Sequence, residues 1–308
     1  MTLLQEEIQQ SFQEYQQISL TKAQEAFYRQ SFLHDGQFYW PEESYPLEKN
    51  RYALIWLPAC PRAQRVAATI HLLGLTDWIE TIELAPHKDQ SWHFPATMDG
   101  AYYLYELFEQ KAEGIQPCLY DKKRHEVITN DQYNLSKILV RFSNQLEKTP
   151  SWKLYPVDKQ SQIDAMSGFI FQHVNVQIYR AGHAANVEDK RKEDKKLAQT
   201  FQILDRHLGQ YSFLFGDTLT DADLRLFPSL LRCPIYAKQF ALDSCQLAGY
   251  ENLRGYVHKI YQIPAIRETT KLEQIVETHY RSPHNLKTFG SKYQKETITS
   301  TFGELEII

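Results

Sequence analysis

Hydrophobic positions in the first half of the chain form short apolar runs that alternate with amphipathic stretches. The run Tyr52–Leu57 is rich in β-branched and aromatic residues and predicts a buried strand that ends at Pro58-Ala-Cys-Pro61. An amphipathic helix is predicted next, because apolar residues recur there at i, i+4 and i+7, and Gly74 is placed to end it. These apolar residues are Val66, Ile70 and Leu73.

The same alternation continues to residue 146. Further strands are predicted at Trp78–Leu84, Ile115–Tyr120 and Glu126–Ile128, and helical segments at Ala101–Phe108 and Asn134–Leu146. The resulting order, βαβαββα, is typical of a thioredoxin-like domain. Before residue 45 the chain is rich in Gln and aromatic residues with little apolar periodicity, which indicates an irregular arm.

Beyond Thr149-Pro150 nearly every segment has a helical period. Helices are predicted at Ile163–Tyr179, from Glu188 onward, at Leu253–Ile260 and at Leu272–Tyr280. The charged stretch Glu188–Lys196 is interpreted as a solvated helix face rather than a binding patch, and the apolar face that follows it comprises Leu197, Phe201, Leu204 and Leu208. Thr220 and Asp223 have the spacing of a capping box, a structural device that starts a helix.

The predicted fold class is therefore an α/β thioredoxin-like domain followed by an all-helical domain. We expect an N-terminal arm at residues 1–48, the thioredoxin-like domain at 49–147, and the all-α domain with a C-terminal extension at 148–308. A length of 308 residues agrees with two domains of unequal size.

Composition excludes several classes of protein. The formal net charge of -4 excludes a strongly basic nucleic-acid binder, and no apolar run reaches the roughly 18 residues of a membrane span. The beginning of the sequence lacks the pattern of a secretion signal, so we expect a cytoplasmic location. The four cysteines form neither a CxxC pair nor a zinc spacing, and the eleven histidines include no HExxH, so no metal is expected.

Cys60 is the strongest candidate for a catalytic residue because it directly precedes Pro61. Proline favours the first position of a helix, which makes Cys60 the expected N-cap. There the free N–H groups and the positive end of the helix dipole favour a thiolate, and Arg62 adds a positive charge. The functional interpretation is a nucleophile, and the structural alternative is an ordinary buried cysteine. Cys118, inside an apolar strand, is expected in the core.

Three further places are candidates for binding a ligand. Pro117 stands within a strand pattern, so a cis bond that exposes the backbone of Gln116 is expected. Asn130-Asp131-Gln132 precedes a helix and can hold an amino-acid moiety, although a plain helix cap by Asp131 is an equal alternative. Tyr179 and Tyr280 can donate hydrogen bonds to a phenolic ligand, or can simply pack.

Together these segments resemble a cytosolic glutathione transferase, and more particularly a glutathionyl-hydroquinone reductase, also called a Xi-class glutathione transferase. The ordered set is specific although no single motif is. It comprises Arg51-Tyr52 through Cys60-Pro-Arg-Ala63, Ser91-Trp-His-Phe94, Leu119-Tyr-Asp-Lys-Lys123, Ile178-Tyr-Arg-Ala-Gly182, Gly216 to Phe227, Tyr250 to Tyr256, Ile260-Tyr-Gln-Ile-Pro264 and His279-Tyr280.

The resemblance implies a homodimeric enzyme that uses glutathione as co-substrate and needs no bound redox cofactor. It makes Cys60 the nucleophile, Trp92 the tryptophan beside the thiol site and Gln116 the residue before a cis Pro117. Tyr179 and Tyr280 match tyrosines that flank the hydroquinone. The remaining binding positions depart from the family pattern, since Arg62 replaces Trp, Gln116 replaces Val, and Asp131-Gln132 replace Glu-Ser.

The implied reaction removes glutathione from a glutathionyl-hydroquinone through a mixed disulfide on Cys60, with Tyr179 and Tyr280 assisting at the quinoid oxygens. Arg62 can pair with a glutathione carboxylate or lower the thiol pKa. Two alternatives stay open. One is a glutaredoxin-like thioltransferase that uses glutathione or another low-molecular-weight thiol, and the other is a non-catalytic scaffold that has kept the fold.

Overall fold

The computed structural model describes residues 33–34, 37–38, 40–108, 116–281, 286–287 and 298–307. The described residues fall into two compact units. Unit 1 contains residues 153–264, 286–287 and 298–307, and unit 2 contains the others. Residues 1–32, 35–36 and 39 of the expected N-terminal arm lie outside the described residues, as does Ile115.

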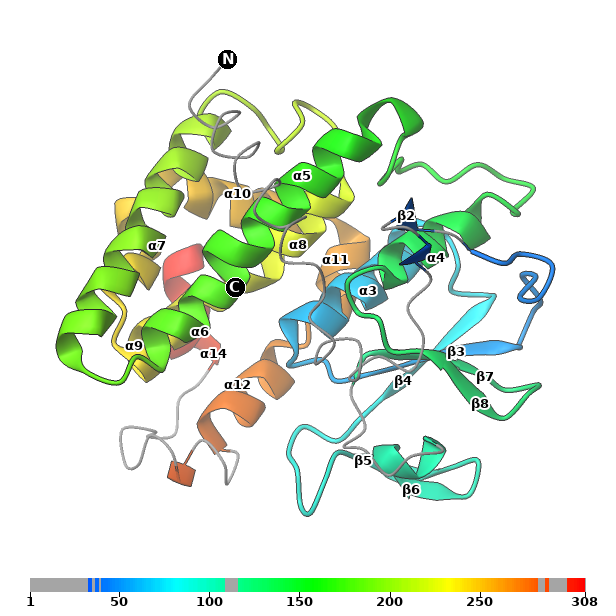
Figure 1. The fold of residues 1–308 in the computed structure, drawn as a ribbon. Coiled ribbons are helices and arrows are strands. Elements are labelled where there is room, and N and C mark those ends of the chain that lie inside the picture. Colours follow the sequence, from blue (N-terminus) through cyan, green and yellow to red (C-terminus); the bar gives the residue numbers. More distant parts are fainter. Residues whose placement is uncertain are drawn as a thin grey trace. The chain divides into compact units, whose positions relative to one another are not determined.

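Unit 2 is built on a four-stranded sheet in the order β4-β3-β7-β8. The central strand β3 runs parallel to β4 and antiparallel to β7, and all its residues are buried. Helices α3 and α4 contact each other, and α3 contacts β3 (Figure 1). The elements are β3 (Tyr52–Trp56), α3 (Pro61–Leu72), β4 (Ile79–Glu83), β7 (Cys118–Asp121), β8 (Glu126–Thr129) and α4 (Leu135–Ser143).

These elements confirm the predicted thioredoxin-like order, apart from its second helix. Gly74 directly follows the last turn of α3 with φ of +68°, a left-handed conformation that glycine adopts without strain. Cys118 is fully buried in β7, as expected of a core residue.

The helical segment predicted at Ala101–Phe108 is wrong in its first half. Strand β5 (His93–Met98) pairs with β6 (Ala101–Tyr103), and only a short 3-10 turn, η1 (Leu104–Leu107), follows. Asp99 and Gly100 join the two strands, both with positive φ, as a two-residue hairpin turn requires. This Asp-Gly pair was the available sequence signal for the hairpin.

Two helices from late in the chain also belong to unit 2. From Ala265 onward, α11 (Pro264–Thr269) and α12 (Leu272–Arg281) group with the sheet, although their sequence lies in the segment expected to form the helical domain. Buried Gln64 of α3 donates to Thr270 at 2.8 Å, and Gln274 donates to Glu83 at 2.9 Å. These bonds connect the segment to α3 and β4. The domain limits at residues 48 and 147 stay a prediction.

A small separate hairpin also falls in unit 2. Strand β1 (Leu33–His34) pairs antiparallel with β2 (Gln37–Phe38). This hairpin lies within the segment predicted as an irregular arm, so its four described residues differ from that expectation.

Unit 1 is helical, as predicted for the second half of the chain. Its principal helices are α5 (Gln160–Ile170), α6 (Gln177–Gly182), α7 (Val187–Leu208), α8 (Asp221–Leu231), α9 (Cys233–Phe240) and α10 (Glu251–Tyr261). Shorter elements are η2 (Val157–Lys159), η4 (Asp243–Cys245), η5 (Leu247–Gly249), α14 (Ile298–Phe302) and η7 (Gly303–Leu305). The helix predicted at Ile163–Tyr179 extends from Gln160 to Gly182. The π-helical segment η3 (Phe171–Val176) joins α5 to α6 within it.

Helix α8 has no solvent-facing side. Every residue from Asp221 to Leu231 is buried. At its start Thr220 and Asp223 form the predicted capping box, in which each side chain meets the backbone N–H of the other. The Asp223 carboxylate also accepts hydrogen bonds from Leu214 N and Tyr256 Oη, both at 2.9 Å.

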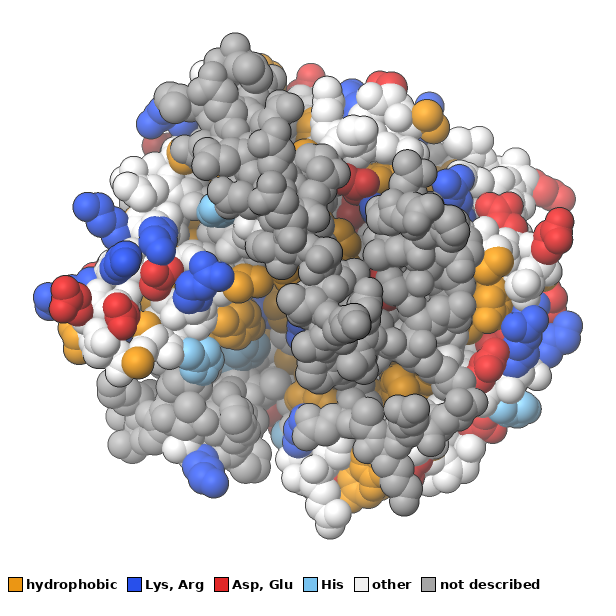
Figure 2. Space-filling model, viewed as in Figure 1, with side chains coloured by type: hydrophobic (Ala, Val, Ile, Leu, Met, Phe, Trp, Pro, Cys, Tyr) orange, Lys and Arg blue, Asp and Glu red, His pale blue; other side chains and the backbone are white. Residues whose placement is uncertain are grey.

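Helix α7 separates an apolar face from a charged one, as predicted. Leu197, Phe201, Leu204 and Leu208 are buried. Side chains of Glu188–Lys196 are exposed or half-buried, and charges of both signs intermingle at the left edge of Figure 2, where Figure 1 draws α6 and α7. Mixed signs agree with a solvated helix face.

Candidate active site

Cys60 lies at the N-cap of α3, as predicted from the proline that follows it. Its backbone is extended, with φ of -79° and ψ of 121°, and Pro61 occupies the first helical position. The Cys60 carbonyl accepts the Gln64 N–H at 2.9 Å, which begins the hydrogen-bond ladder of the helix. The residue is only 9% exposed, so the thiol meets solvent over a small area.

The surroundings of Cys60 lower the pKa of its thiol. Burial alone raises that pKa, because it disfavours the charged thiolate. The positive charge of Arg62, the backbone N–H groups of Ala63 and Arg62, and the side-chain amide of Gln116 together outweigh burial. Neither backbone group forms a cap hydrogen bond of regular geometry to the sulfur. A lowered pKa means a larger thiolate fraction at neutral pH, and the thiolate is the nucleophilic form.

Gln116 lies just before β7, and its side chain reaches Cys60. The Gln116–Pro117 bond is cis, as predicted. The Gln116 side chain is buried, and its Oε1 accepts the Leu57 N–H at 3.2 Å while its amide favours the thiolate of Cys60. This contact of the side chain was not foreseen, because the sequence pointed only to the Gln116 backbone as a ligand contact.

Asp131 acts as the cap of the turn that leads into α4. Its Oδ1 accepts the N–H groups of Tyr133 at 3.1 Å and Asn134 at 3.3 Å, and its Oδ2 accepts Asn134 Nδ2 at 2.7 Å. Asp131 therefore caps the turn before the helix, while Asn134 is the N-cap of α4 itself. These bonds fix the carboxylate next to half-buried Gln132. A role for either residue in holding a thiol ligand stays a prediction.

Trp92 and Tyr280 belong to the same unit as Cys60. Trp92 is half-buried directly before β5, and Lys88 Nζ lies 5.2 Å from the centroid of its ring. Tyr280 lies on α12 and is only 4% exposed. Unit 2 thus contains Cys60 and all the predicted thiol-binding residues, together with one of the two predicted phenols.

Tyr179 belongs to unit 1, so its approach to Cys60 stays a prediction. On α6 its side chain is 41% exposed, and its hydroxyl shares a hydrogen bond of 3.2 Å with the hydroxyl of Tyr236. Burial raises the pKa of Tyr236 well above its usual value, and the neighbouring Tyr179 raises it further. Tyr236 therefore keeps its proton at neutral pH.

An aromatic group surrounds Tyr179. The Tyr179 ring lies nearly parallel to that of His183 and edge-on to Tyr236 and Phe240. A Cβ atom added at Gly182 would lie 2.5 Å from the Phe240 ring, so this helix position must be glycine for Phe240 to pack here. Sequence reasoning missed Tyr236 and Phe240, since among many aromatic residues nothing local marks those that meet Tyr179.

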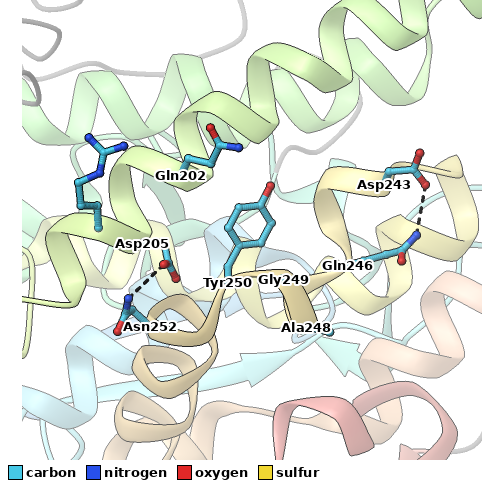
Figure 3. Close-up of a pocket in the computed structure, with 9 residues that line it drawn as sticks. Gln202, Asp205, Asp243, Gln246, Ala248, Gly249, Tyr250 and Asn252 are labelled. Atoms are coloured by element: carbon cyan, nitrogen blue, oxygen red, sulfur yellow. Dashed lines mark hydrogen bonds between the residues drawn. The ribbon is translucent and has the colours of Figure 1, made fainter.

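An open polar cavity of about 720 Å³ lies in unit 1. Its lining comes from α7, η4, η5 and α10, and Figure 3 shows Tyr250 between the Asp205–Asn252 pair and the Asp243–Gln246 pair. The carboxylates are already hydrogen-bonded, Asp205 to Asn252 and Leu253 N, and Asp243 to Gln246. No cysteine lines this cavity, and we assign no chemistry to it.

Within the described residues, no group of three or more His, Cys, Asp or Glu side chains is placed to hold a metal ion. In the same part of the chain, none of the helices combines the length and the apolar character needed to cross a membrane.

The fold and the cysteine at a helix start define a class of protein. A thioredoxin-like unit with a helical unit is the architecture of glutathione transferases, and residues 185–259 match the family model of the glutathione S-transferase C-terminal domain. The chain is 30% identical to glutathionyl-hydroquinone reductase YqjG of Escherichia coli strain K12 over 260 residues, 79% of this chain and 78% of YqjG.

Two further comparisons agree. Glutathionyl-hydroquinone reductase PcpF of Sphingobium chlorophenolicum is 29% identical over 77% of this chain and 80% of its own. The glutathione-bound structure of E. coli YqjG superposes with a TM-score of 0.71 at 29% identity, over 84% of this chain and 89% of that one. The chain belongs to the glutathionyl-hydroquinone reductase family, the Xi class of glutathione transferases, and is an enzyme. Membership of this enzyme family argues against the non-catalytic scaffold.

Proposed function

We propose that the protein removes glutathione from glutathionyl-hydroquinones, with Cys60 as the nucleophile and glutathione as the second substrate. The single observation that carries this proposal is the position of Cys60 at the N-cap of α3, where Arg62, two backbone N–H groups and Gln116 lower the thiol pKa. Glutathione binding to the related YqjG supports the choice of thiol.

The first half of the reaction forms a mixed disulfide. The Cys60 thiolate attacks the sulfur of the glutathionyl group, a sulfur–sulfur bond forms, and the bond between sulfur and the ring carbon breaks. The electron pair of the broken bond stays on the ring carbon, which takes up a proton, so the ring is reduced and the sulfur is oxidised. Tyr179 and Tyr280 donate hydrogen bonds or protons to the two ring oxygens in this proposal.

The second half restores the enzyme by thiol–disulfide exchange. A glutathione thiolate attacks the glutathionyl sulfur of the mixed disulfide, oxidised glutathione leaves, and the Cys60 thiolate is regenerated. Trp92, Gln116, Pro117, Asp131 and Gln132 form the proposed thiol-binding site. Arg62 is exposed beside the sulfur and is proposed to pair with a glutathione carboxylate as well.

Intact-protein mass spectrometry tests the proposal directly. Wild type, Cys60→Ser and Cys245→Ser are incubated with glutathionyl-menadiol without reductant, and glutathione is then added. We expect one glutathione adduct on wild type and on Cys245→Ser, cleared by glutathione with release of menadiol, and none on Cys60→Ser. Cys245 is a matched control because it is a buried free cysteine of unit 1. An adduct on Cys60→Ser would overturn the nucleophile assignment.

The choice of substrate distinguishes the proposed reductase from the thioltransferase alternative. The lowered thiol pKa favours exchange with simple mixed disulfides equally well, so the rates with glutathionyl-menadiol and with a cysteine–glutathione mixed disulfide must be compared. We expect the hydroquinone adduct to have the higher kcat/KM, and a higher value for the mixed disulfide would favour the alternative.

We also propose a homodimer in the cytoplasm, as the family resemblance implies. The four free cysteines agree with a reducing compartment. Light scattering coupled to gel filtration should give a mass near twice 36.2 kDa, and a mass of one chain would refute the dimer.

A further inference from the structure

Arg65 is a buried arginine on the helix that begins at Cys60. It is 3% exposed, although its guanidinium stays charged at every physiological pH. A buried charge is costly unless hydrogen bonds compensate it, so its partners show what the residue does. Two of those partners lie in the turn that contains Asp131 and Gln132.

Arg65 Nη2 donates to the backbone carbonyls of Gln132 at 2.5 Å and Tyr133 at 3.2 Å. These carbonyls belong to two consecutive peptide groups. In a trans peptide the C=O and the following N–H point in opposite directions. The N–H groups of Tyr133 and Asn134 are therefore turned away from Arg65.

The same two N–H groups converge on the Asp131 carboxylate. Both donate to its Oδ1, at 3.1 and 3.3 Å. A continuous chain of hydrogen bonds thus runs from the Arg65 guanidinium, through two peptide groups, to the carboxylate. Each peptide dipole has its negative end toward the cation and its positive end toward the anion, so each bond in the chain strengthens the next.

We propose that Arg65 is a positioning residue of the thiol-binding site: through these peptide groups it fixes Asp131 and Gln132 relative to Cys60, and so sets the affinity for the glutathionyl part of the substrate. This inference rests on the proposed function, in which Asp131 and Gln132 hold the glutathionyl group. Arg65 takes no part in the sulfur chemistry. Arg65 lies on α3, whose N-cap is Cys60, so its bonds hold the turn at a fixed position relative to the nucleophile.

The test compares Arg65→Lys with wild type. Both carbonyls accept from the single Nη2 atom, and a lysine side chain ends one bond short of that position, so its ammonium cannot hold the two carbonyls in the same geometry. We expect the Kd for S-methylglutathione, a thioether that cannot form a disulfide, to rise about tenfold by calorimetry. The KM for glutathionyl-menadiol should rise alike, with kcat and the pH profile of Cys60 alkylation unchanged.

Arg51→Lys is the matched control. Arg51 is also buried in unit 2, where it pairs with Asp121 at 2.7 Å, but it precedes β3, at the end remote from Cys60. We expect Arg51→Lys to lower the melting temperature as Arg65→Lys does, with the Kd unchanged. Equal Kd values for Arg65→Lys and wild type would overturn the inference, as would a loss confined to kcat.

A double-mutant cycle tests the route through Asp131. If Arg65 acts through that carboxylate, Arg65→Lys should weaken binding about tenfold in wild type and less than about twofold in Asp131→Asn. Additive effects would refute the route. Failure of wild type itself to bind S-methylglutathione would instead refute the proposed function, and this inference with it.

Discussion

Helices α3 and α8 both have an ionisable side chain at their start, Cys60 at the N-cap of α3 and Asp223 in the first turn of α8, yet the two beginnings differ in their chemistry. At α8, the fully buried Asp223 accepts four hydrogen bonds, from Leu214, Thr220 and Tyr256. At α3, the sulfur of Cys60 has no regular cap bond. The carboxylate at α8 stabilises the fold, whereas the group at α3 is a thiol, which can react once it is ionised.

The pKa values of the two groups move in opposite directions. Burial raises the pKa of Asp223, and its four hydrogen bonds only partly reverse that effect. Burial also opposes ionisation of Cys60, but Arg62 and the neighbouring amides lower its pKa overall. Arg62 makes the largest contribution to the lowering at Cys60, and among the described residues no cation contributes at Asp223. Each prediction below changes one side of this comparison.

Cys60→Ser should have the largest effect on activity and almost none on stability. Serine cannot form the mixed disulfide, so turnover should fall below detection. Because serine is a good N-cap, the free energy of unfolding should change by less than about 1 kcal/mol. Urea unfolding beside the activity assay checks both, and a large loss of stability would mean that Cys60 is a structural cap.

Asp223→Ala should have the largest effect on stability. Four buried donors lose their acceptor, which should cost about 4 kcal/mol, while the alkylation rate of Cys60 in the folded protein stays as in wild type. Urea unfolding and iodoacetamide labelling test the two halves. A stability loss below about 1 kcal/mol would show that the capping box is dispensable.

Asp223 also predicts a pH dependence of stability. Its folded pKa is raised above the unfolded value, so the proton-linked stabilisation is present below the ordinary carboxyl pKa and is lost as the pH rises through the raised one. Asp223→Asn should remove this contribution from the acid limb of the curve of unfolding free energy against pH. Identical wild-type and variant slopes there would contradict it.

Arg62→Gln should have a smaller effect, confined to the thiol. Removing the cation raises the pKa of Cys60, so alkylation at pH 7 should slow by about threefold. At a pH well above both pKa values the two rates should converge, since both thiols are then ionised. Arg124→Gln, which changes an arginine of the β7–β8 turn, is the control. Rates that differ equally at every pH would show that Arg62 acts by sterics instead of charge.

Thr220→Val should have the smallest effect. It removes one hydroxyl from the capping box but keeps the shape, which should cost about 1 kcal/mol of unfolding free energy. A cost equal to that of Asp223→Ala would mean that threonine, rather than the carboxylate, organises the start of α8.

The features predictable from the sequence are those that depend on neighbours in the chain. Cys60-Pro61 and Thr220 with Asp223 are local patterns, and both appear as expected. The Gln116 side chain was missed because its contact depends on strand register: β3 and β7 pair with Ile55 opposite Cys118, which places Gln116 beside Leu57. No local pattern indicates such a register.

Arg65 was missed for a related reason. Its helical position suggests only that it lies on α3, and its burial follows from the packing of the turn before α4. The role of Asp131 could not be decided from the sequence, because a helix cap and a ligand contact both place a carboxylate at the start of a helix. Local chemistry thus predicted the helix start at Cys60, whereas the contacts of the residues around it come from tertiary packing.

Helix α8 has a consequence for how this chain can change over evolutionary time. Because every side chain from Asp221 to Leu231 is buried, no position on it offers a surface where a substitution is neutral by default. Each change there alters the packing of several neighbours at once. Sequence drift should therefore collect on the charged face of α7 and in exposed turns, while α8 keeps its length and pattern among related chains.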